Sequence, residues 1–147
     1  TSLEEVLSRC GSEGGLLGLC GYNDMRDIEE RAVAGDKHCR LAIEVFASAV
    51  RDYLGAFTVE LGGLDAISFT GGIGENSALT RALTLKHLAV LGLRIDPDNN
   101  SALPRGQAGR IEAKGSPAIL VIPTDEERQI AEESLDLLDT QPRSQTA

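Results

Sequence analysis

Residues 65–76 read Asp65-Ala-Ile-Ser-Phe-Thr-Gly-Gly-Ile-Gly-Glu-Asn76. The apolar residues in 66–70 predict a short strand, and the glycines of 71–74 predict a tight loop. Asn76 or Ser77 can cap a helix that follows at once. A loop with so few Cβ atoms can bring backbone N–H groups against a ligand, and the helix start beyond it favours an anionic group.

Two other interpretations of the glycines stay open at this level. They can form a tight strand-to-helix turn that meets no ligand. The spacing Gly72-x-Gly74-x-x-Ser77, followed by a helix, a strand and Asp96, also imitates a dinucleotide-binding unit. That match is imperfect, since Ser77 stands where Gly or Ala is usual and the acid comes late.

The first sixty residues predict helices. We expect a short helix over Leu3–Cys10, a loop over Gly11–Gly21, and a helix from Asn23 or Asp24 to Gly35. A long helix should run from about Asp36 to Leu61. Its predicted buried face consists of Ala42, Phe46, Ala49, Val50, Tyr53 and Phe57, and the residues predicted to turn away are Arg40, Glu44, Arg51 and Asp52.

The rest of the chain predicts strands and helices in alternation. The helix after the glycine loop should carry Leu79, Leu83, His87 and Leu91 on one face. A brief strand over 93–95, a polar loop over 96–107, a weak strand around 110–113 and a stronger strand over 118–122 follow. The last helix should have an inner side of Ile130, Ala131, Ser134, Leu135 and Leu138, and 140–147 have the composition of a tail.

This pattern predicts a mixed α/β fold in which helices cover a sheet. About four strands are few for a complete domain of this class, so we expect the sheet to be shared with chain outside this sequence.

Composition narrows the partners. A net charge of −9 argues against nucleic acid, yet a nucleotide needs only backbone N–H groups and a metal ion. No apolar run approaches the roughly 20 residues that span a membrane, and no signal peptide is evident. The three cysteines form no C-x-x-C pair, which predicts free thiols in a reducing cytoplasm.

Two acidic segments are further candidates. In Pro123-Thr124-Asp125-Glu126-Glu127, Thr124 and Glu127 suit a capping box, or one carboxylate holds Mg²⁺. In Asn23-Asp24-Met25-Arg26-Asp27, Asp24 can cap a helix and pair with Arg26. Alternatively, Asp24 accepts hydrogen bonds from a ribose and Arg26 meets a ring face or a phosphate. His38 is expected at the surface, and His87 as a core histidine.

Four segments in this order closely resemble the acetate kinase family, which includes propionate kinases. They are Gly15–Gly21, Asp24-Met-Arg26, Leu64-Asp-Ala-Ile-Ser-Phe-Thr-Gly-Gly-Ile-Gly-Glu-Asn76 and Ile122-Pro-Thr-Asp-Glu-Glu127. The likeness runs from about Leu3 to Leu138 and makes the dinucleotide interpretation unattractive. It implies the C-terminal nucleotide-binding domain of the actin, Hsp70 and sugar-kinase (ribonuclease H-like) superfamily, over residues 1–139, with 140–147 as a flexible tail.

The resemblance also implies a reaction and its site. Family members transfer the γ-phosphoryl group of ATP to acetate or propionate, giving an acyl phosphate and ADP, and require Mg²⁺. The matching nucleotide contacts are Asp24, Met25, Arg26, Gly72, Ile73, Gly74, Glu75 and Asn76, and the matching magnesium ligand is Glu126. In the family the glycine loop lies against adenosine, which changes the phosphate contact expected from the loop alone.

The family's catalytic and acyl-binding residues lie upstream, and no segment here matches them. We therefore expect an excised domain or a split-gene product without the N-terminal catalytic domain and without activity of its own. The resemblance further implies a homodimer, in which the long helix helps to pair subunits. A nucleotide-free assembly module of the same fold is the alternative from another functional class.

Overall fold

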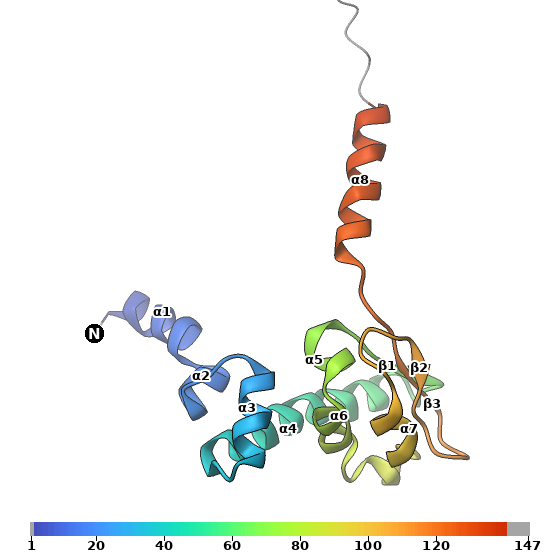
Figure 1. Cartoon of the computed structure of the whole chain (residues 1–147), viewed down its shortest axis with the longest axis horizontal. Coiled ribbons are helices and arrows are strands. Elements are labelled where there is room, and N and C mark those ends of the chain that lie inside the picture. The colour runs from blue at the N-terminus through green and yellow to red at the C-terminus, as the bar shows by residue number, and fades with distance from the viewer. Residues whose placement is uncertain (1, 141–147) are drawn as a thin grey trace, which may run out of the picture.

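Three short strands form a sheet in the computed structural model, which describes residues 2–140 (Figure 1). The order is β1 (Ala66–Phe69), β3 (Ala118–Val121), β2 (Gly109–Arg110). β1 and β3 are parallel, with Ala66 opposite Ala118 and Phe69 opposite Val121, whereas β2 is antiparallel to β3. Because parallel strands end at the same edge of a sheet, the glycine segment after β1 and the acidic segment after β3 meet there.

One apolar cluster joins this sheet to the helices beside it. It contains the buried residues Leu85, Leu88, Leu93, Ile111, Ile119 and Val121. Leu85 comes from α6 (Ala78–Leu85), and Leu88 from the short 3₁₀ helix η1 (Leu88–Leu91). The predicted strands at 66–70 and 118–122 are confirmed. The predicted strand at 93–95 is wrong, because Ile95 makes only a single bridge to Glu112.

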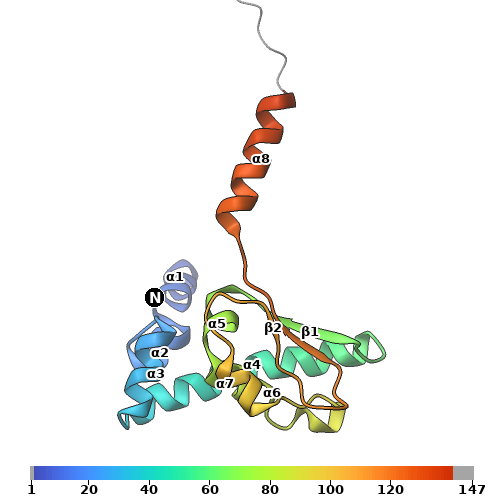
Figure 2. The same cartoon turned by 45° about the vertical axis from the view of Figure 1, so that its right-hand side comes forward.

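A second cluster holds the helices of the N-terminal half together. Met25 and Ile28 of α3 (Met25–Val33) pack against Cys39, Ala42 and Ile43 of α4 (Lys37–Glu60). Both helices have the caps that the sequence predicts. Asp24 accepts a hydrogen bond from the Arg26 amide, and Asp36 accepts from the amides of residues 38 and 39. Figure 2 shows α4 extending from α3 across the body towards β1.

The predicted buried face of α4 is only partly right. Ala42 is buried and Phe46 half-buried, but Tyr53 and Phe57 are 66% and 59% exposed. Arg51, predicted to turn away, donates to the carbonyl oxygens of residues 83 and 84 on α6. Apolar residues lie on two adjacent sides of α4, so their helical spacing does not indicate which side packs on the body. The packed side consists of Cys39, Ala42, Ile43, Ala47 and Thr58.

Three segments predicted as loops contain helices. The 11–21 segment holds the end of α1 (Leu3–Glu13) and α2 (Gly15–Cys20), the 71–74 loop lies in α5 (Gly71–Asn76), and the 96–107 loop contains α7 (Pro97–Ala102). Packing of Leu16 and Cys20 on the second cluster stabilises α2 despite its glycines. The Asp96 side chain caps α7, and Pro97 suits its first turn.

The helix expected to continue to Leu91 ends instead at Leu85. His87 follows with a φ of 72°, a left-handed conformation, and its side chain is exposed. The prediction of a core histidine there is wrong, and His38 is exposed as predicted. The buried side of α6 consists of Thr80, Arg81, Thr84 and Leu85, so it differs from the predicted Leu79 and Leu83 face.

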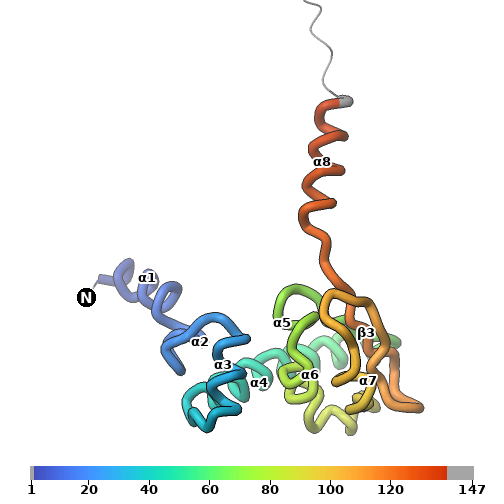
Figure 3. Tube along the Cα trace, in the orientation of Figure 1, coloured from blue at the N-terminus to red at the C-terminus, as the bar shows by residue number. Residues whose placement is uncertain are grey.

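The last helix, α8 (Glu126–Thr140), stands away from the body in Figures 1 and 3. Ile130 and Leu138 are 64% and 67% exposed. Their predicted inner side is therefore wrong for this structure, since the described body offers no surface to it. Thr140 is still part of α8, and the rest of the predicted tail, 141–147, lies outside the described residues. Within 2–140, no helix has the length and apolarity to cross a membrane.

Candidate functional site

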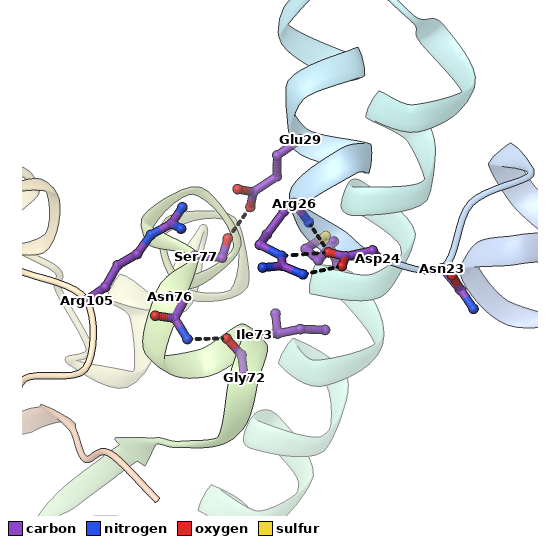
Figure 4. A pocket seen from close by; sticks show the side chains of 10 residues that line it. Asn23, Asp24, Arg26, Glu29, Gly72, Ile73, Asn76, Ser77 and Arg105 are labelled. Carbon is purple, nitrogen blue, oxygen red and sulfur yellow. Dashed lines mark hydrogen bonds and ion pairs between the residues drawn. The ribbon is translucent and has the colours of Figure 1, made fainter.

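The first turn of α3 and the helix α5 enclose a pocket of about 590 Å³ (Figure 4). Asp24, Met25 and Arg26 line one side, and Gly72, Ile73 and Asn76 line the other. These six residues were all predicted from the sequence as parts of one nucleotide site. The remaining lining residues are Asn23, Glu29, Ser77 and Arg105.

Asp24 and Arg26 form a two-point ion pair at the pocket. Arg26 Nε donates to Asp24 Oδ1 at 3.1 Å, and a terminal guanidinium nitrogen donates to Oδ2 at 2.6 Å. The Arg26 backbone amide also donates to Oδ1, which is the cap of α3. The hydrogen bonds from the Arg26 side chain and amide lower the pKa of Asp24 to about 2. The carboxylate is therefore ionised and held in a fixed direction at neutral pH.

α5 presents an open backbone to the same pocket. Gly71 turns the chain out of β1 with a φ of 71°, a conformation that glycine adopts without strain. Apart from its chain neighbours and the backbone of its own helix, no described atom lies within 4 Å of the position that a Cβ on Gly72 would occupy. The Asn76 side-chain amide donates to the Gly72 carbonyl at 2.9 Å, and Ile73 packs on the second cluster. A planar ligand can thus approach Gly72 and Ile73 closely.

Two charged residues that line the pocket, Glu29 and Arg105, were not predicted from the sequence. The Glu29 carboxylate accepts hydrogen bonds from Ser77 Oγ and, at 3.4 Å, from Thr80 Oγ1, and so links α3 to α6. Arg105 lies across the pocket from Asp24 in Figure 4. It makes no hydrogen bond or ion pair with the described residues. The capping serine Ser77 was visible in the sequence, but nothing there pointed to its partner 48 residues away.

Gly74 and Glu75 belong to α5 but do not line this pocket. A Cβ on Gly74 would lie 3.3 Å from the Phe69 carbonyl carbon, so the glycine allows close packing on β1. The Glu75 carboxylate accepts from Thr124 N at 2.8 Å and Thr124 Oγ1 at 2.9 Å, and these bonds lower its pKa. Glu75 therefore ties the glycine segment to the acidic segment at the edge of the sheet.

The capping prediction for α8 needs correction. Thr124 is engaged with Glu75, and Asp125 Oδ1 instead accepts from the Arg128 amide at 3.1 Å. Asp125 is therefore the residue whose side chain binds the first turn of α8. The Glu126 carboxylate is exposed and makes no hydrogen bond or ion pair to the described residues. No group of three or more His, Cys, Asp or Glu side chains that could hold a metal occurs within the described part of the chain.

Comparison with known proteins gives consistent relatives. The family model described as "Acetokinase family" matches residues 1–132. The acetate kinase of Ectopseudomonas mendocina is 49% identical over 139 residues, which are 94% of this chain and 35% of that protein. An acetate kinase of Pseudomonas aeruginosa is 50% identical, again over 94% of this chain and 35% of that protein.

Solved structures agree with the sequence relatives. A propionate kinase from Francisella tularensis has a TM-score of 0.82 and 41% identity, over 90% of this chain and 34% of that one. The acetate kinase of Entamoeba histolytica has a TM-score of 0.82 and 27% identity, over 92% and 37%. The chain therefore spans about a third of the length of the relatives that it matches.

Proposed function

The chain belongs to the acetate kinase family, and we propose that it is the ATP-side portion of an enzyme that transfers the γ-phosphoryl group of ATP to acetate. Residues 1–139 would form the C-terminal nucleotide-binding domain of an actin, Hsp70 and sugar-kinase type of fold. The family match over residues 1–132 and the mixed α/β structure support this proposal.

One observation carries the nucleotide assignment. Two segments nearly fifty residues apart in sequence, around Arg26 and Ile73, come together on one pocket. Its volume of about 590 Å³ lies within the range of roughly 300–1,000 Å³ usual for small-molecule sites. We propose that adenosine lies against Gly72 and Ile73, that the Asp24 carboxylate accepts from the ribose, and that the Arg26 guanidinium meets the base.

Calorimetric titration with ADP and ATP tests this assignment. We expect binding in the millimolar range, because the chain spans only about a third of its relatives' length and would supply one side of the site. Arg26→Ala should weaken binding at least about tenfold, or 1.4 kcal/mol. Arg128→Ala is the matched control, because both arginines are 72% exposed and paired with one acid. No heat from the unmodified chain at millimolar nucleotide would contradict the proposal and favour a nucleotide-free assembly module.

We propose that Glu126 supplies one carboxylate to Mg²⁺. A single carboxylate suits this ion, which keeps several waters and binds phosphate oxygens when a nucleotide is present. Its free, exposed carboxylate fits that role, although the described residues hold no complete metal site. Glu126→Ala should abolish the gain in ATP affinity that Mg²⁺ brings, whereas Glu127→Ala should retain it. Equal Mg²⁺ dependence in both variants would reduce Glu126 to a helix-start acid.

Phosphoryl transfer needs groups that this sequence does not match, so we propose that the 147 residues alone have no kinase activity. Incubation with ATP, Mg²⁺ and acetate should leave no acyl phosphate that hydroxylamine can trap. Trapped product above a blank without protein would contradict this proposal.

A propionate kinase is the alternative, supported by the likeness to the Francisella tularensis propionate kinase. Joining this chain to the part of a relative that it does not match, and comparing the rates with acetate and propionate, would test the acyl preference.

We also propose that α4 helps to form a homodimer. Its exposed apolar side chains include Leu41, Val45, Tyr53 and Phe57, and monomeric surfaces seldom leave such a stripe uncovered. Sedimentation should detect dimers that Phe57→Arg disrupts and that Val90→Arg, a change at a more exposed apolar residue, leaves intact. A monomer at all concentrations would contradict the proposal.

A further inference from the structure

Arg81 is an arginine buried in the body, with only 2% of its surface exposed. It lies on α6, and its hydrogen bonds reach two other helices. Nε donates to Asn100 Oδ1 at 2.8 Å, and one terminal nitrogen donates to the Gly74 and Glu75 carbonyl oxygens at 2.9 and 2.8 Å. The other donates to the Asn100 carbonyl at 3.1 Å. Every contact therefore joins α6 to α5 or α7.

Asn100 completes this arrangement from α7. It is 4% exposed, and its side-chain amide donates to the Ala78 carbonyl at 2.9 Å. Among the described residues no carboxylate accepts a hydrogen bond from Arg81, so carbonyl and amide oxygens offset its charge. Burial lowers the pKa of Arg81, while Glu29 opposes that effect from a distance. A buried cation held in this way is costly, and an apolar residue of similar volume often gives equal stability.

Two of the Arg81 hydrogen bonds are made to α5, the helix that lines one side of the pocket. Gly74 and Glu75 form the last turn of α5, whereas Gly72, Ile73 and Asn76 of the same six-residue helix line the pocket. The carbonyls at the end of a helix carry partial negative charge, which a guanidinium stabilises. Fixing those two carbonyls fixes the orientation of so short a helix.

We propose that Arg81 and Asn100 are positioning residues that hold α5 in the conformation that a nucleotide requires. This inference rests on the proposed nucleotide site and deepens it, since neither residue touches the pocket. A core role would affect only stability, whereas a positioning role must affect ligand affinity in molecules that are still folded.

The test measures ADP affinity and thermal midpoint together on the 147-residue chain. The variants are Arg81→Gln, Arg81→Lys and, in case these unfold, Asn100→Ala. Arg51→Gln is the matched control, because Arg51 also donates to two backbone carbonyls of α6 but at the end away from α5. Titrations are run well below the lowest midpoint, and hydrogen exchange reports the backbone amides of 72–77.

We expect Arg81→Gln to raise the Kd for ADP about tenfold or more and to speed exchange over 72–77. Arg81→Lys should recover part of the affinity, since an ammonium group reaches only some of the four acceptors. Arg51→Gln should lower the midpoint and leave the Kd unchanged. Equal Kd values for the Arg81 and Arg51 variants would overturn the positioning role alone. An unmodified chain that binds no ADP would overturn the proposed function together with this inference.

Discussion

Asp24 serves the fold and the candidate site with the same two oxygen atoms. Its pKa is lowered from 3.8 to about 2, first by the Arg26 side-chain hydrogen bond and then by the Arg26 amide. Because the pKa of Asp24 is lower in the folded than in the unfolded state, the ionised carboxylate contributes to folding stability, fully so above about pH 4. That contribution to stability is lost as the pH falls through about 2. Site geometry around Arg26 should therefore be constant across the neutral range.

We predict that carbon-13 NMR gives Asp24 a pKa near 2 and that Arg26→Ala raises it towards 3.8. The rise should be incomplete, since the backbone amide at position 26 still donates to the carboxylate. Arg9→Ala, which breaks a similar exposed pair with Glu13, is the control and should leave Asp24 unchanged. An Asp24 pKa that ignores the loss of Arg26 would contradict the pairing.

Thr84 has a buried hydroxyl without a partner. The residue is 1% exposed, and its Oγ1 makes no hydrogen bond to the described residues. An unsatisfied buried polar group costs about 1–3 kcal/mol. We predict that Thr84→Val, which keeps the shape and removes the hydroxyl, raises the free energy of unfolding by about 1 kcal/mol in urea titration. Thr80→Val should instead destabilise, because Thr80 Oγ1 donates to Glu29.

At the scale of an element, α5 depends on two adjacent glycines for different reasons. Gly71 has a φ of 71°, which a residue with a Cβ adopts at a cost of about 1–2 kcal/mol. Gly72 is open, and alanine there favours a helix by up to about 1 kcal/mol. We predict that Gly71→Ala destabilises the chain, whereas Gly72→Ala preserves stability and weakens ADP binding roughly tenfold. Equal affinity after Gly72→Ala would mean that no ligand approaches this backbone.

The elements also show which parts of the structure a sequence reveals. Strands 66–70 and 118–122 and the caps at Asp24 and Asp36 were predictable, because each depends on neighbouring residues. The α2, α5 and α7 helices were not, since glycine and polar residues conceal short helices that caps and tertiary contacts stabilise. Six pocket residues were predicted through the family resemblance. The roles of Glu29 and Arg81 depend instead on hydrogen bonds across the fold, and Arg105 reaches the pocket from a distant part of the sequence.

At the scale of the whole molecule, the parallel pairing of β1 with β3 organises the site. It brings the ends of both strands to one edge, where Glu75 of the glycine segment holds Thr124 of the acidic segment. The proposed adenosine pocket and the proposed Mg²⁺ ligand Glu126 are therefore connected through one carboxylate. α8 begins directly after this connection and then leaves the body (Figure 1).

We predict that α8 contributes almost nothing to the stability of the body. Ile130, Leu135 and Leu138 remain mostly exposed, so deleting the helix removes little packing. A chain ending at Asp125 keeps Thr124 for Glu75 and should unfold within about 0.5 kcal/mol of the full sequence in urea. It should also associate less in sedimentation, because an exposed apolar stripe is lost. Leu93→Ala, at a buried residue of the sheet core, is the contrasting control and should cost about 2–5 kcal/mol. A loss above about 1 kcal/mol on deleting α8 would mean that the helix packs on the body in solution.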